Sequence, residues 1–156
     1  MASILKVDEI QDISGKKILQ NTGGVLQVVE GTRTDGTNTA SSSYVDAGLS
    51  ASITPTSSSS KVLVIVAAGF GNTSASTNNN VRILRDSTEI RSFSRVAFQA
   101  NGHVNAHQIF TVLDSPSTTS ATTYKVQYMT DGGNFRINDS SGDTSVATIT
   151  LMEISA

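Results

Sequence analysis

The stretch KVLVIVAAGFG, residues 61–71, decides the fold class of this chain. Aliphatic residues, many of them β-branched, run through it without a polar break, between the turn-forming segments PTSSSS (55–60) and NTSASTNNN (72–80). A short apolar run bounded in this way is typical of a strand buried on both faces. Its apolar core, residues 62–68, is about a third of a membrane span. We therefore expect a central β-strand and no membrane insertion.

Further strand candidates follow on both sides of this segment at a spacing of about ten residues. They are residues 25–30, 44–54, 81–98 with a hairpin turn at 85–88, 106–116, 123–130, 135–139 and 146–155. Residues 31–43 are expected to form a loop or exposed edge structure, and Gly48 a bend or bulge. No segment after residue 24 has helical periodicity. The pattern predicts an all-β fold, an antiparallel β-sandwich with a jelly-roll-like head; an up-and-down barrel is the open alternative.

The composition favours one domain that gains stability by association. The chain has 156 residues and no cysteine, and only 5% of its residues are aromatic. Of the 156 residues, 42 are Ser or Thr, which form strands and turns rather than helices. Because a thin core without disulfides needs other support, an oligomer is expected. The net charge of −2 argues against nucleic acid as a partner.

The opening segment, MASILKVDEIQDISGKKILQNTGG (1–24), differs from the rest of the chain. It carries apolar residues three positions apart: Ile4, Val7, Ile10 and Ile13. This spacing fits neither a strand nor a heptad, although a short helical turn over residues 8–13 is one alternative. Terminal segments are usually disordered unless something holds them. We expect an extended arm (1–24) that docks on a partner, ahead of a head domain (25–156); the other alternative is the first strand of the sandwich.

Few residues of the chain suggest a catalytic site or a metal site. His103 and His107 have the spacing of paired metal ligands on a helix, but their surroundings predict strand and turn, and no Cys or Glu completes a site. The segment DSSGD (139–143) lacks the third acidic ligand and the closing Glu of a calcium loop. No nucleophile elbow or informative carboxylate pair is present. We expect no enzyme activity, no metal and no cofactor.

Four of the basic residues cluster in one window of the sequence. They are Arg82, Arg85, Arg91 and Arg95. The cluster suggests a surface that recognises an anionic glycan, or contacts between subunits. A solvated hairpin face is the alternative interpretation.

Three blocks of sequence carry a resemblance to a known class of proteins. They are ILKVDEIQDISGKKIL near the start, DAGLSASITPTSSSSKVLVIV (46–66) and VATITLMEIS (146–155). Together they resemble short structural fibre or knob proteins of tailed bacteriophages, of the marine phage and cyanophage type. The first block has the family's KVDxIQDxSG pattern, which is matched by Lys6, Val7, Asp8, Ile10, Gln11, Asp12, Ser14 and Gly15.

The resemblance implies a homotrimeric virion protein that is made in the host cytoplasm. Its arm would bind another virion protein of the tail, baseplate or capsid, and its head would face outward towards a host surface glycan. The residues that would anchor the arm are Ile4, Val7, Asp8, Ile10, Gln11 and Ile13. Only a short link, residues 18–24, separates arm and head, whereas long fibres have a shaft. This departure raises an alternative role as a capsid decoration or cement protein.

Overall fold

The computed structural model describes residues 10–11, 13–14, 17–19, 24–74, 77–97, 104–138 and 145–156. None of these residues lies in a helix, so none forms a helix that could cross a membrane. The strands are β1 (Ile10–Gln11), β2 (Lys17–Leu19), β3 (Val25–Arg33), β4 (Thr37–Thr39), β5 (Val45–Ile53), β6 (Lys61–Asn72), β7 (Asn79–Arg85), β8 (Thr88–Phe93), β9 (Val104–Asp114), β10 (Thr122–Thr130), β11 (Phe135–Ile137) and β12 (Ala147–Ile154).

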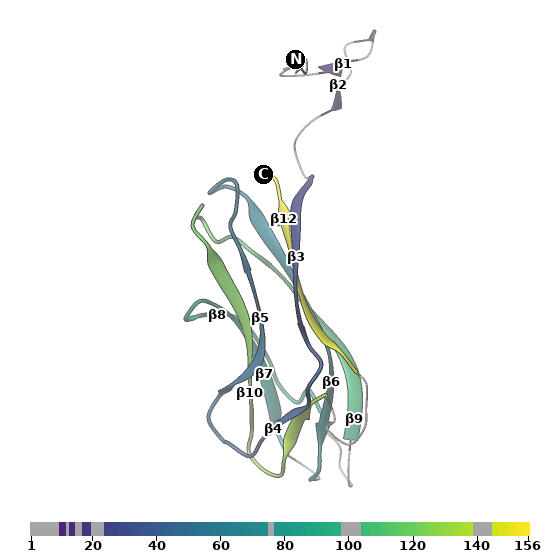
Figure 1. Cartoon of the computed structure of the whole chain (residues 1–156), viewed down its shortest axis with the longest axis vertical. Helices are drawn as coiled ribbons and strands as arrows, with labels where there is room; N and C mark the ends of the chain where they lie inside the picture. The colour runs from purple at the N-terminus through teal and green to yellow at the C-terminus, as the bar shows by residue number, and fades with distance from the viewer. Residues whose placement is uncertain are drawn as a thin grey trace.

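Two antiparallel sheets form a sandwich around one core (Figure 1). The first sheet has the order β3-β12-β6-β11-β4, with β9 paired to the free side of β6. Strand β12 pairs with residues 61–67 of β6 and β11 with residues 70–72, so both lie on the side opposite β9. The second sheet has the order β5-β10-β7-β8. The expected all-β, antiparallel sandwich is confirmed.

The up-and-down barrel is wrong, because the described strands form two separate sheets and strands adjacent in sequence are mostly not adjacent in space. Helix formation at residues 8–13 is also wrong at Ile10 and Gln11, which form β1. Strand β1 pairs with β2 in a two-stranded sheet of their own, and neither strand joins a sandwich sheet. The jelly-roll connectivity stays a prediction at this point.

The central strand differs from its prediction in one respect. The side chains of Val62, Val64 and Val66 are completely buried in the core, but Leu63 and Ile65 on the other face of β6 are only half-buried. The prediction of burial on both faces is therefore wrong for this chain, although both faces are apolar. The unbroken apolar run arises because the outer face of the first sheet is itself hydrophobic.

The other strand predictions fit with small shifts. The hairpin at residues 85–88 is confirmed: Arg85 pairs with Thr88, and Asp86 takes a φ of 53° in the turn. Gly48 has a φ of 70° and lies where the pairing of β5 and β10 shifts its register, so the expected bulge is confirmed. Of residues 31–43, expected as loop or edge structure, the first few extend β3 and others form β4 at the sheet edge.

The antiparallel order gives the sandwich two distinct ends. At the terminal end, β3 begins and β12 ends, and Gly24 and Ser155 are joined by hydrogen bonds of 3.0 and 2.9 Å. At the loop end, β5, β7 and β9 begin and β6 and β10 end. Figure 1 shows the C-terminus at one end of the sandwich and β4 at the other. The N-terminal segment therefore joins the head beside the C-terminus, away from the loop end.

Candidate functional site

The outer face of the first sheet carries a row of exposed apolar side chains. Residues that are paired across strands project to the same face. Val28 of β3 pairs with Met152 of β12, which pairs with Leu63 of β6, and Leu63 pairs with Leu113 of β9. Val28 is 55% exposed and Leu113 is 53% exposed. A continuous apolar row thus crosses the whole sheet on its solvent side.

Two further rows extend this surface towards the loop end. They are Glu30–Thr150–Ile65–Thr111 and Thr32–Thr148–Ala67–Ile109. Ile109 is 70% exposed, and Glu30 is the one ionisable residue in the three rows. We call these twelve residues, of which seven are apolar and four are threonines, the outer apolar face. A surface of this kind on a soluble protein marks an interaction site.

The outer face of the second sheet is polar. The Arg82 guanidinium lies 4.1 Å above the ring of Tyr44 and donates hydrogen bonds of 2.6 and 2.9 Å to Gln127 Oε1. It also pairs with Glu89 at 3.1 Å. The Gln127 amide donates to Asp46 at 2.7 Å, and this bond lowers the pKa of the Asp46 carboxyl. The two outer faces of the sandwich therefore have opposite chemical character.

The four arginines do not form one patch. Arg82 lies on the polar outer face, and Arg85 lies at the terminal end, where it pairs with Asp114. Arg91 stands over the Phe93 ring at 5.9 Å, and Arg95 is at the loop end. Each guanidinium has a different partner within the chain. Whether any of the four takes part in recognition or subunit contact stays a prediction.

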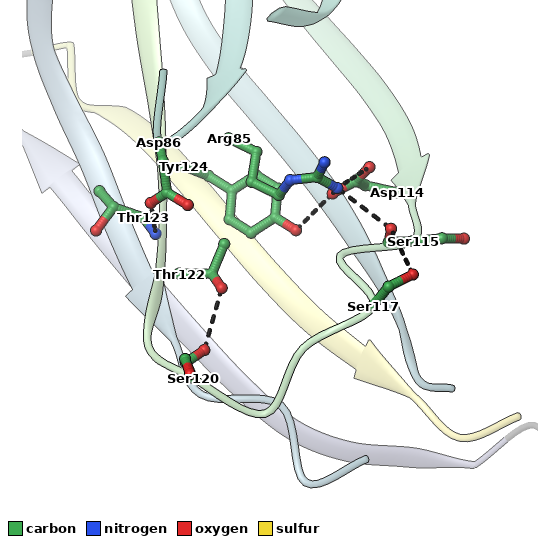
Figure 2. Close-up of polar contacts among 9 residues, drawn as sticks. All are labelled: Arg85, Asp86, Asp114, Ser115, Ser117, Ser120, Thr122, Thr123 and Tyr124. Atoms are coloured by element: carbon green, nitrogen blue, oxygen red, sulfur yellow. Dashed lines mark hydrogen bonds and ion pairs between the residues drawn. The ribbon is translucent and has the colours of Figure 1, made fainter. Parts of the chain in front are cut away.

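Arg85 belongs to a polar network that joins the two sheets (Figure 2). Its Nη1 donates to both Asp114 oxygens at 2.9 and 3.0 Å, and the buried Tyr124 hydroxyl donates to Asp114 Oδ2 at 2.8 Å. Burial, together with the hydrogen bond to Asp114, raises the pKa of the Tyr124 phenol far above its usual value. The Asp114 carboxylate thus has partners on both β7 and β10, and the network ties the two sheets together.

The loop end carries a second polar cluster. The Asn78 backbone and side-chain amides both donate to the Asp131 carboxylate at 2.6 Å, and Arg95 Nε donates to Asn78 Oδ1 at 3.1 Å. The hydrogen bonds from Asn78 lower the pKa of Asp131. Amide, carboxylate and guanidinium groups of this kind bind sugar hydroxyls. Sequence reasoning missed this cluster, because its members lie in three separate segments.

A small cavity lies beside the outer apolar face, near the loop end. Its volume is about 30 Å³, and Gly69, Gly71, His107 and Arg136 contribute to its lining. The space fits one or two water molecules. His107 lies over Gly69, while His103 and residues 139–143 fall outside the described residues. Among the residues that the structure describes, no group of three or more His, Asp or Glu could hold a metal.

The arm residues are only partly covered by the structure. Ile10 and Gln11 form β1, and the Ile13 side chain is fully exposed in the turn that follows. Ile4, Val7 and Asp8 lie outside the described residues. Their role as an anchor stays a prediction.

Sequence reasoning also did not locate the outer apolar face. The signal was present in residues 61–67, where the positions between the buried valines are apolar instead of polar.

Comparison with known proteins does not assign the chain to a family. No protein-family model matches the chain, and no curated protein matches it.

Proposed function

We propose that this chain is a non-enzymatic structural protein of a tailed phage particle. It forms a homotrimeric short fibre or knob, is anchored by its N-terminal arm (1–24) to another virion protein, and contacts the host surface with its head. It is made in the host cytoplasm and resides in the virion. The KVDxIQDxSG pattern in the arm supports the family, and the geometry of the head supports the assembly.

The outer apolar face is the observation that carries this proposal. A monomeric soluble sandwich normally has polar residues at its outward positions, as the second sheet does here. The first sheet instead exposes Val28, Leu113 and Ile109. A structural protein that functions as a trimer has a use for such a face, whereas a binding domain that acts alone would be prone to aggregate.

The strand order supports a jelly-roll connection of the head. One sheet contains β3, β12, β6 and β9 in that order, and the other contains β5, β10, β7 and β8. Apart from the short β4 and β11, eight strands divided in this order between two layers are what two Greek keys produce. We therefore keep the jelly-roll head as part of the proposal.

The two unlike ends of the head support attachment at one end and recognition at the other. The segment that leads to the arm leaves the sandwich at Gly24, next to Ser155. The polar cluster of Asn78, Asp131 and Arg95 lies at the opposite end. An anchored arm would thus point this cluster outward, where a host surface glycan is the expected ligand.

Localisation of the chain in a cryo-EM map of the whole particle tests the proposal. We expect threefold-symmetric density on the tail or at a fibre tip, with the loop end outermost. Absence of the chain from purified particles would overturn the proposal.

The second candidate function is a capsid decoration or cement protein. Strand β2 ends at Leu19 and β3 begins at Val25, which leaves no room for a fibre shaft between arm and head. Density on the capsid lattice in the same map would select this function. Particles that lack the chain should then lose resistance to heat and osmotic shock, and unchanged resistance would exclude it.

A further inference from the structure

Strand β9 combines a free edge with an exposed apolar side. It runs for 11 residues, and β6 is its one strand partner in the part of the chain that the structure describes. From Val104 to Leu113 it contains no proline, lysine or acidic residue. Soluble proteins usually protect such edges with charges, prolines or bulges, because unprotected strands associate. Within the part of the chain that the structure describes, no charge, proline or bulge of this kind protects β9 before Asp114, which suggests that another chain covers it.

We propose that the outer apolar face and the edge of β9 form the contact between copies of this chain in a cyclic trimer. The proposal rests on the proposed function and assigns its subunit interface. The centre of the contact is the row Val28–Met152–Leu63–Leu113, together with Ile109. The face of the second sheet remains in contact with solvent.

The outer apolar face has the size of a functional surface patch. Its three rows span residues 63–67 of β6, about 17 Å at about 3.3 Å per residue, and four strands about 4.8 Å apart give a width of about 19 Å. The projected area is therefore roughly 300 Å², so the edge of β9 has to supply much of the roughly 800 Å² per partner that specific interfaces bury.

The charge pattern favours a second copy over a charged partner. Glu30 is the one ionisable residue of the outer apolar face, and its carboxylate already accepts a hydrogen bond from Thr150 at 3.2 Å. The face therefore offers nothing to an acidic or basic macromolecule. An apolar, nearly uncharged surface matches the composition of subunit interfaces between identical chains.

The two unlike ends of the head favour a symmetry axis along the strands over a twofold axis perpendicular to them. Cyclic packing around one axis keeps all terminal ends on one side and all loop ends on the other. The three arms would then leave together beside Ser155, as anchoring to one partner requires. A twofold axis perpendicular to the strands would point the arms in opposite directions.

The mass of the full chain in solution tests this inference with two variants. Ile109→Glu combined with Leu113→Glu places two charges on the outer apolar face. Ser92→Glu adds a charge at an exposed position of β8, on the opposite sheet, and serves as the matched control. We expect the wild type and S92E to have about three times the 16.3 kDa chain mass, and the double variant to be a folded monomer. A trimeric double variant would overturn the assigned interface but leave the proposed function standing.

A monomeric wild type at micromolar concentration would instead overturn the homotrimer of the proposed function.

Cysteine labelling tests the same interface if the double variant fails to fold. The chain has no cysteine, so Leu113→Cys and Ser92→Cys each introduce a single thiol. Residue 113 is 53% exposed in the single chain, so protection of its thiol from a maleimide would show that another chain covers it. Equal labelling of both thiols in the native trimer would overturn the inference.

Discussion

Glu153 shows how one buried side chain makes the stability of the head depend on pH. It is completely buried, and its carboxylate accepts hydrogen bonds from the Thr56 N–H and hydroxyl at 2.7 Å and from the Gln27 amide at 2.6 Å. Burial alone would raise the pKa of this carboxyl, but the hydrogen bonds outweigh burial and lower the pKa to about 2. The folded state thus favours the charged form, and Glu153 stabilises the head fully above about pH 4.5.

We predict that the free energy of unfolding falls as the pH drops from about 4.5 towards about 2, where Glu153 becomes protonated. In Glu153→Gln, the new amide donor must face either the two donors of Thr56 or the Gln27 amide donor, so this variant should lose about 1–3 kcal/mol at neutral pH. It should also depend less on pH in the acid range. Urea unfolding from pH 7 to pH 2 measures both effects. Glu89→Gln, at an exposed carboxylate, is the control and should unfold like the wild type; an E153Q variant as stable as this control would contradict the prediction.

Gly31 allows the two sheets to approach each other at one edge of the sandwich. A Cβ at this position would lie 2.0 Å from the Ser50 carbonyl oxygen, which is a backbone atom of β5 and cannot move aside. Gly31→Ala should therefore cost about 1–3 kcal/mol through overpacking. Gly24→Ala is the matched control, since its Cβ would have no atom closer than 4.0 Å. Thermal melts of both variants measure the difference, and equal melting temperatures would show that the sheet edges are not held this closely.

At the scale of the elements, the network in Figure 2 joins the strands β7, β9 and β10. Tyr124→Phe removes the hydroxyl that donates to Asp114 and should cost about 1.5–3 kcal/mol, because the acceptor is charged and mostly buried. Tyr44→Phe makes the same chemical change beside Arg82, where the ring contact remains, and should change stability by less than about 0.5 kcal/mol. Urea midpoints of the two variants give the comparison; similar losses would contradict a special role for the network.

Strands in which apolar and polar residues alternate could be predicted from the sequence. Strands that form only because a distant segment pairs with them could not. In β10, the buried Tyr124, Val126 and Tyr128 alternate with polar residues, so period and burial agree. The polar segment of β4 becomes a strand only because β11 lies beside it. The polar cluster at the loop end could not be predicted either, because Asn78 and Asp131 bond to each other although they are 53 positions apart in the sequence.

The whole molecule has two unlike faces and two unlike ends, and neither contrast is visible in its overall composition. The faces arise from the outward positions of two sheets that share one core. The ends arise from the strand directions, which bring Gly24 and Ser155 together. The particle protein that we propose would use both contrasts: the apolar side for contact between its copies, one end for attachment and the other end for exposure.

We expect the arm to contribute to attachment and not to the folding of the head. β1 and β2 pair with each other and join neither sandwich sheet, and the Ile13 side chain is fully exposed. Deletion of residues 1–20 should therefore leave the melting temperature of the head unchanged within a few degrees and abolish incorporation into particles. Ile13→Glu should weaken incorporation without altering stability, because exposed positions tolerate charge. Unfolding of the truncated head would show instead that the arm belongs to the core, and normal incorporation of both variants would remove its role as the anchor.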